Sequence, residues 1–309
     1  MAGKLSKYEE VALKEIHQWK NPTPSRFSRI TGWASAPFDV AGRAFNRIPG
    51  IEWVIQKTVG GLITLLNDGA QWSLRPDSIY SEFRKKGYLV NNAQDIFRLD
   101  LADVDKVLGA LGAKYRSLSA AEGGGTGFIG LPGIPVDIVS TIFLSLRAIG
   151  EYATYCGFET KLQSEQLFAL GLLGYASSPD QAAKNAAMAQ LVKIAKDVAS
   201  KAPWRDLQKS VLVQIIKQVA NALGIRLTKQ KLAQVLPVVS SVIGIGFNAY
   251  FMGKICDSAF YLYRERFLAA KYGPDVIEVV GKIPVNYASA FDDALANVSQ
   301  TDEISPESP

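Results

Sequence analysis

A few polar side chains interrupt the most apolar parts of this 309-residue chain, and they are the residues best placed to do chemistry. Asp137, Arg147 and Glu151 lie on one predicted helix, and Asn248 interrupts a second apolar helix. Arg147 and Glu151 are four residues apart, so they can pair on one helical face. Asp137 falls in a first helical turn, where the helix dipole favours a carboxylate. The four residues predict either an internal ion pair that orders a core or a pocket that contacts a small molecule or lipid.

Histidine-based catalysis has little support, because His17 is the single histidine of the chain. Ser–His–Asp and Cys–His machinery both need a histidine base, and most transition-metal sites use an imidazole. His17 lies on a charged amphipathic helix near Glu15, which indicates a surface histidine. The adjacent carboxylates Glu9 and Glu10 point about 100° apart on a helix, so we expect a solvated face there. No metal site and no cofactor are predicted, no catalytic residue is identified, and enzymatic activity is left open with the balance against it.

The segment Gly125–Gly130 matches the GxGxxG pattern of dinucleotide-binding sites. That fingerprint requires a strand before it and a helix directly after it. Here a helical, alanine- and serine-containing segment precedes the glycines, and Pro132 interrupts the segment after them. The glycines therefore indicate a flexible or tightly packed backbone crossing more than a nucleotide site.

The elements that must position these residues all show helical periodicity. No segment shows the sustained two-residue alternation that is typical of a strand. Apolar spacing, proline starts and glycine ends predict helices over residues 5–20, 49–74, 76–87, 135–155, 166–176, 179–201, 203–224, 228–236 and 237–272, and one or two more over 95–114. We predict an all-α fold, a single multi-helix domain with glycine- and proline-rich apolar central helices and an N-terminal amphipathic helix. The predicted boundaries are 1–22 for that helix, 23–296 for the domain and 297–309 for a polar, disordered tail.

Composition bears on location and partners. Cys156 and Cys256 are the only cysteines, and the N-terminus has no apolar signal-peptide region, so a cytoplasmic protein is expected. The net charge is +5, the pI is about 9.0 and the mean hydropathy is +0.07. Because the basic residues are scattered, no specific nucleic acid is expected, whereas anionic lipid is a possible partner. Residues 232–253 carry no formal charge and are long enough to span a bilayer. Their proline, serines and asparagine favour a buried helix instead.

Two segments resemble the EcsC protein family. The first runs from the Gly130–Gly133 turn through Asp137 to Tyr155-Cys156-Gly157-Phe158, and it has the family's glycine- and proline-rich lead and leucine-arginine helix. The second is residues 231–271, similar to the family's proline-apolar-glycine-asparagine-tyrosine helix and basic stretch. The resemblance covers residues 5 to 275, with Cys156 and the segment 76–100 as departures.

The resemblance implies a bacterial cytoplasmic helical protein loosely linked to membrane processes, without an agreed biochemical activity. We therefore expect peripheral association with membrane lipids or a membrane protein at the inner face of the cell membrane. The residues expected at that surface are Phe128, Ile129, Leu131, Arg264 and Arg266. The alternatives are a ligand pocket around Asp137, Arg147, Glu151 and Asn248, or a protein–protein scaffold that uses the N-terminal helix. The oligomeric state is left open.

Overall fold

A computed structural model describes residues 4–22, 74–121, 136–178, 181–200, 219–220, 223 and 240–278. All regular structure in these ranges is helical, which confirms the predicted all-α class. The helices are α1 (Lys7–Lys20), α4 (Pro76–Lys85), α5 (Ala93–Ile96), α6 (Leu101–Leu108), α7 (Leu111–Ala121), α8 (Val136–Tyr155), α9 (Gln163–Ser177), α10 (Gln181–Ala199) and α12 (Ser240–Tyr272), followed by the 3-10 turn η5 (Pro274–Val276).

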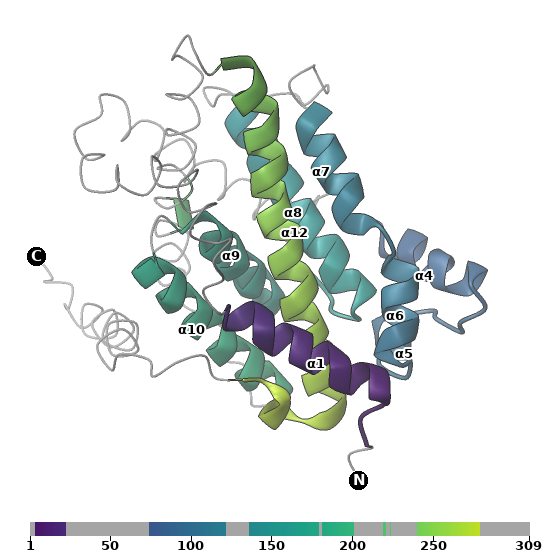
Figure 1. Ribbon diagram of the computed structural model, residues 1–309. Helices are drawn as coiled ribbons and strands as arrows, with labels where there is room; N and C mark the ends of the chain where they lie inside the picture. Colours follow the sequence, from purple (N-terminus) through teal and green to yellow (C-terminus); the bar gives the residue numbers. More distant parts are fainter. Residues whose placement is uncertain are drawn as a thin grey trace, which may run out of the picture.

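The 33-residue helix α12 is the axis of the fold (Figure 1). At 1.5 Å per residue it is about 50 Å long, enough for several helices to pack along it. Helices α7, α8 and α9 lie against its length, and α1 crosses it near its C-terminal end (Figure 1). Because α1 packs on α12 and α6, the N-terminal amphipathic helix is an integral part of this bundle.

The directions of α7 and α8 follow from their contacts. Gly112 of α7 lies beside Cys256 of α12, and Arg116 lies beside Gly253, so α7 runs antiparallel to α12. The Tyr152 ring of α8 contacts Phe260 with centroids 6.5 Å apart, and Phe158 contacts Tyr263 at 5.7 Å, so α8 runs parallel to α12. The C-terminus of α7 and the N-termini of α8 and α12 therefore lie at one end of the bundle, toward the top of Figure 1. We call this the glycine-bearing end, after Gly244 and Gly246 in the first two turns of α12.

Local sequence explains where the helices begin and end. Ser6 accepts from the backbone N–H of Glu9 while the Glu9 carboxylate accepts from that of Ser6, a reciprocal cap that begins α1. Pro76 begins α4, as predicted, since a first-turn proline loses no helical hydrogen bond. After α8 the chain reverses at Gly157 with φ +83°, a conformation that side chains with a Cβ rarely adopt.

The segment predicted as one or two helices over residues 95–114 is three shorter ones. Asn92 caps α5 and Asp100 caps α6, each through a side-chain oxygen that accepts from the helix backbone. Gly109, with φ +54°, separates α6 from α7. These breaks let α6 and α7 meet different parts of α12 and α8, and the apolar periodicity alone did not show them.

The core is continuous through the described helices, and aromatic residues fill the part of it around the C-terminal half of α12. Phe97, Phe158, Phe267, Phe168 and Tyr263 form a chain of ring contacts with centroids 5.3–5.8 Å apart. Where α7 meets α8, a methyl group on Gly112 would lie 3.1 Å from the Tyr152 hydroxyl oxygen. A glycine at position 112 therefore allows α7 to approach α8 and α12 closely.

Candidate functional site

The charged side chains of greatest interest are three consecutive residues on α12, Arg264, Glu265 and Arg266. All three are buried, with 1–2% of each residue exposed. Successive helical residues point about 100° apart, so the three side chains face three different neighbours. Burying a charge without a partner is very unfavourable, so each of them must find an opposite charge on another element.

Arg264 faces α1 and α6. Its Nη2 lies 2.9 Å from Oδ2 of Asp105, and its Nη1 donates to Oε2 of Glu15 at 3.2 Å. The Tyr8 hydroxyl also donates to Oδ2 of Asp105, at 2.8 Å. Burial raises the pKa of Asp105, and the positive charge of Arg264 offsets that only in part. Within the described ranges, Arg264 Nε and Asp105 Oδ1 are buried without a hydrogen-bond partner.

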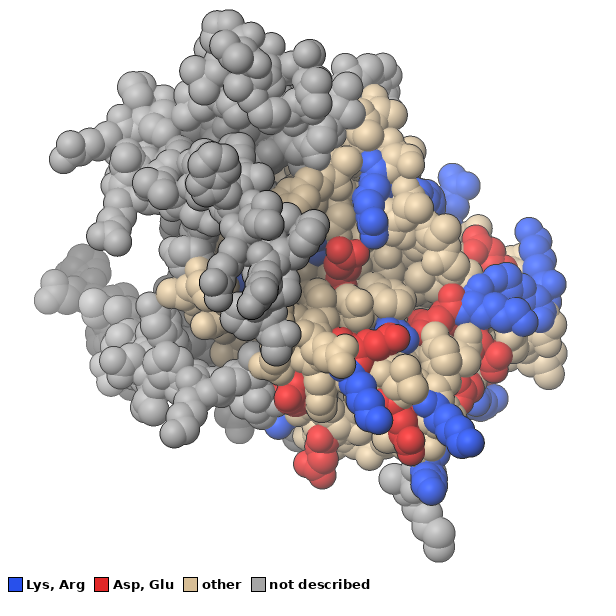
Figure 2. Space-filling model, in the orientation of Figure 1, with Lys and Arg blue, Asp and Glu red and all other residues tan. Residues whose placement is uncertain are grey.

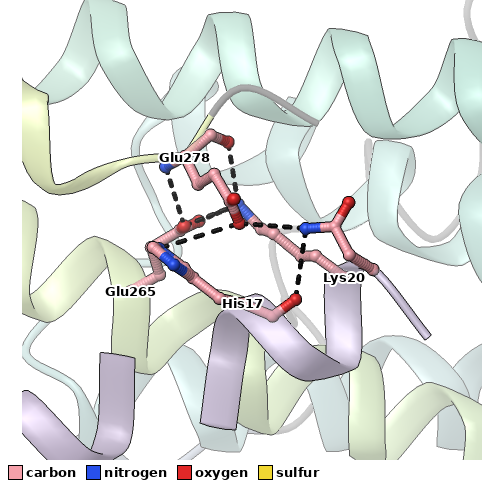
Figure 3. A network of polar contacts seen from close by, with 5 residues as sticks. His17, Lys20, Glu265 and Glu278 are labelled. Carbon is pink, nitrogen blue, oxygen red and sulfur yellow. Dashed lines mark hydrogen bonds and ion pairs between the residues drawn. The ribbon is translucent and has the colours of Figure 1, made fainter. Parts of the chain in front are cut away.

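Glu265 faces α1 and the chain after η5 (Figure 3). Lys20 Nζ donates to both carboxylate oxygens of Glu265, at 2.5 and 2.6 Å, and to the carbonyl oxygen of Glu278 at 3.2 Å. The backbone N–H of Glu278 donates in turn to Glu265, at 3.2 Å. Burial raises the pKa of Glu265 despite the Lys20 charge. Nε2 of His17 lies 3.7 Å from the Glu278 carboxylate, and 44% of the His17 side chain is exposed, in keeping with the surface position expected.

Arg266 faces α9. Its two Nη groups donate to the two carboxylate oxygens of Glu165, one of them at 2.6 Å. The guanidinium carbon lies 4.1 Å from the ring centroids of Phe158 and Phe168, so the cation is enclosed by aromatic faces. A planar guanidinium suits this arrangement because it can stack and form a two-pronged pair together.

These positions correct two interpretations of the sequence. Arg264 and Arg266 were expected at a membrane or partner surface, but both are buried because acidic residues on α1, α6 and α9 converge on them. Glu9 was expected on a solvated face, yet its side chain is fully buried and accepts from Lys271 at 3.0 Å and Tyr272 at 2.6 Å. Burial opposes ionisation of Glu9, but the hydrogen bonds from Tyr272, Ser6 and Lys271 lower its pKa below the ordinary value.

A second polar cluster contains two of the predicted ligand-binding residues. Arg147 Nε lies 3.5 Å from Oε1 of Glu151, so the predicted four-residue pair forms on α8. Lys114 of α7 donates to the other oxygen of Glu151 at 2.8 Å. The adjacent Tyr115 is fully buried, and its hydroxyl has no hydrogen-bond partner within the described ranges. We call these four side chains the α7–α8 cluster.

The other predicted site residues are not joined to this cluster by any described contact. Asp137 lies on α8 ten residues before Arg147, about 15 Å away along the helix axis. Asn248 lies in the first half of α12, and the side chains of Asp137 and Asn248 are outside the described residues. Phe128, Ile129 and Leu131 also lie outside them. Lys114 and Tyr115 were not predicted from the sequence, because their place beside Glu151 depends on the packing of α7 against α8.

The described residues offer neither a metal centre nor a membrane-spanning helix. Among them, no group of three or more His, Cys, Asp or Glu side chains could hold a metal ion. None of the helices within the described ranges combines the length and the apolar character needed to cross a bilayer. The polar chemistry that these ranges do offer is that of ion pairs: three of them are almost fully enclosed, and others, including those of the α7–α8 cluster, are open to solvent.

These observations define a class of protein: an all-α bundle around one long helix whose interior charges are held by partners on α1, α6 and α9. The chain belongs to the EcsC protein family, whose family model matches residues 10–268. It is also similar to Uncharacterized protein YdbA of Bacillus subtilis (strain 168), at 24% identity over 265 residues, or 82% of this chain and 90% of that protein. No solved structure matches the chain. The resemblance read from the sequence is thus confirmed at the level of the family.

Proposed function

We propose that this protein associates peripherally with the inner face of the cytoplasmic membrane through its glycine-bearing end. The observation that carries the proposal is that the C-terminus of α7 and the N-termini of α8 and α12 lie at the same end of the bundle. The two apolar, glycine-containing segments of the sequence, 123–146 and 232–253, include the starts of α8 and α12, which lie at the same end as the last turn of α7. The described parts of these two segments, which begin at Val136 and Ser240, therefore start at one end of the bundle.

Exposed side chains near that end have the character of interfacial anchors. Leu118, three residues before the end of α7, and Tyr250, ten residues into α12, are 43% and 55% exposed. Nζ of Lys254 lies 4.8 Å from the Tyr250 ring centroid, so an amine and an aromatic ring face solvent together. Tyrosine is enriched at membrane interfaces, and a lysine can extend its amine to anionic headgroups.

The opposite part of the bundle has a different surface. Figure 2 shows charged side chains of both signs concentrated over its lower and right-hand parts, where α1 and α4 to α6 lie. Charged side chains are expensive to dehydrate, so this lower part is poorly suited to face a bilayer. The N-terminal helix supports the scaffold alternative less well, since its apolar residues Ala12 and Ile16 are already buried against the core.

The test is flotation with protein-free vesicles of phosphatidylcholine, with and without phosphatidylglycerol. We expect flotation with the anionic vesicles, reduced by Tyr250→Ser and by Leu118→Ser. Leu89→Ser is the matched control, because Leu89 is 88% exposed but lies between α4 and α5, away from the glycine-bearing end. Failure to float, or equal loss in the Leu89 control, would overturn the proposal. Association with native membranes but not with lipid vesicles would instead indicate a membrane protein as the partner.

A further inference from the structure

The α7–α8 cluster of Lys114, Tyr115, Arg147 and Glu151 has an unbalanced charge. Two cations, Lys114 and Arg147, share the single carboxylate of Glu151. The Lys114 and Arg147 side chains are 50% and 37% exposed, whereas Glu151 is 10% exposed, so the cations face solvent and the carboxylate lies beneath them. One positive charge therefore remains uncompensated within this cluster.

Tyr115 supplies an independent observation at the same place. Its residue is 0% exposed, and its hydroxyl lacks a hydrogen-bond partner within the described part of the chain. Arg147 and Glu151 lie close enough to this hydroxyl to act on it through charge and side-chain polarity, but neither makes a well-formed hydrogen bond to it, so the hydroxyl borders the cluster. A buried hydroxyl without a partner costs about 1–3 kcal/mol, which a ligand oxygen at this position would recover.

We infer that the α7–α8 cluster is a binding site for the phosphate group of a small molecule or a lipid headgroup. Lys114, Arg147 and Tyr115 offer three kinds of donor beside the Glu151 carboxylate, which suits the three terminal oxygens of a phosphate monoester. The guanidinium and ammonium groups favour phosphate through charge-assisted hydrogen bonds. Glu151 keeps the two cations oriented, and it can accept a hydrogen bond from a P–OH group.

This site lies next to the surface proposed for membrane contact, because Lys114 and Leu118 are four residues apart on α7. Arg147 lies eleven residues into α8 from Val136, about 16 Å from the glycine-bearing end along the helix axis. The phosphate site uses Tyr115, Arg147 and Glu151, none of which belongs to the proposed membrane surface, so either proposal can fail alone. The other described interior charges pair within the protein, whereas the α7–α8 cluster has a positive charge left for a ligand.

The primary experiment is thermal unfolding of the full chain with inorganic phosphate, compared with sodium chloride at equal ionic strength. We expect phosphate, but not chloride, to raise the Tm, since a ligand that binds only the folded state stabilises it. Arg147→Gln should abolish this rise. Arg116→Gln should retain it, because Arg116 is a similarly exposed cation on α7 that pairs instead with Asp257 at 3.1 Å. An equal rise in the Arg147→Gln variant, or with chloride, would overturn the inference.

Tyr115→Phe tests the hydroxyl without altering the ring. We expect the phosphate affinity, measured by titration calorimetry, to fall about tenfold, because one hydrogen bond to a charged group is removed. Unchanged affinity would exclude the Tyr115 hydroxyl as a donor and contradict the proposed geometry. Because Tyr115→Phe keeps the buried ring, we expect it to fold, so it still tests the site if Arg147→Gln unfolds.

Glycerol 3-phosphate and vesicles containing phosphatidic acid distinguish the source of the phosphate. Binding of glycerol 3-phosphate with vesicle flotation that is unchanged in Arg147→Gln identifies a soluble ligand. Parallel loss of both in that variant identifies a lipid headgroup. Either result supports a phosphate site, whereas binding of neither probe by the wild-type chain, together with no response to inorganic phosphate, rejects it.

Discussion

Arg266 of α12 and Glu165 of α9 form a two-pronged ion pair inside the bundle, although 101 positions separate them in sequence. Each side chain is 2% exposed, and Phe158 and Phe168 enclose the guanidinium. A carboxylate that is taken out of water needs this partner, because its alternative hydration has been lost. The pair therefore links the packing of α9 to that of α12 through charge as well as through apolar contact.

Glu165→Gln should destabilise the fold by about 3–5 kcal/mol, because it leaves the Arg266 charge buried without an opposite charge. The double replacement Glu165→Leu with Arg266→Met should be less destabilising than the sum of the two single changes, since no isolated charge remains. Urea unfolding followed by circular dichroism measures both effects. Arg116→Met is the control: Arg116 pairs with Asp257 at 3.1 Å, the two side chains are 50% and 53% exposed, and the loss of this pair should cost under about 1 kcal/mol. Additive losses in the double variant would contradict this account.

The contact between Lys20 and Glu265 should control how firmly α1 is held. Lys20→Met removes the only ammonium group among the described partners of Glu265 and leaves a buried carboxylate. We expect α1 to open more readily by about 3 kcal/mol, which corresponds to roughly a hundredfold faster amide hydrogen exchange in this helix. Lys14→Met, at an exposed position of the same helix, should leave the exchange unchanged. Equal protection of α1 in both variants would show that its apolar face alone holds it.

Much of the fold was predictable because helix signals are local. Pro76, the residue at the start of α4, and the apolar spacing of the first helix both led to elements that the structure confirms. The burial of Arg264 and Arg266 was not predictable in the same way. Their partners Glu15 and Glu165 lie 249 and 101 positions away, and a basic helix end looks alike whether solvent or distant carboxylates surround it.

The candidate site was predictable only where its contacts are local. Arg147 and Glu151 are four residues apart on one helix, so their pairing followed from spacing. Lys114 donates to the same carboxylate from α7, and Tyr115 lies beside it without a hydrogen bond to it. Both positions require the packing of α7 against α8. The spacing of Ser6 and Glu9 is that of a helix cap, so the position of the Glu9 carboxylate at the start of α1 was predictable. Its burial was not, because that depends on the distant Tyr272.

Two glycines offer a matched test of backbone strain and close packing. Gly157 and Gly87 have similar left-handed φ values, +83° and +88°, but a Cβ on Gly157 would lie 2.9 Å from the carbonyl oxygen of Ala93, whereas Gly87 has open space around it. Gly87→Ala should cost about 1 kcal/mol through strain alone. Gly157→Ala should cost about 1–3 kcal/mol more, because Ala93 or the Phe97 ring must move. Equal losses of unfolding free energy would mean that the turn after α8 adjusts freely.

Asp105 should make the stability of the protein depend on pH in a direction opposite to that of a simple surface salt bridge. Burial raises the pKa of Asp105 in the folded state, although Arg264 and the Tyr8 hydroxyl lower it in part. Glu15 of α1 repels it, and it also faces Cys156 of α8. A carboxyl group with a raised folded-state pKa binds its proton more tightly in the folded chain. Its stabilising contribution is therefore complete below the ordinary aspartate pKa of about 4, and it is lost as the pH rises through the folded-state value.

Asp105→Asn removes this titration while keeping the side-chain shape. We expect the free energy of unfolding of the wild type, relative to that of the variant, to decrease as the pH is raised from about 4 toward neutrality. Urea unfolding of both proteins at several pH values in that interval measures the difference. Arg264 keeps Glu15 as a partner in the variant, so its guanidinium is not left without an opposite charge. A relative stability that increases with pH would show instead that the Arg264 charge outweighs burial and holds Asp105 ionised.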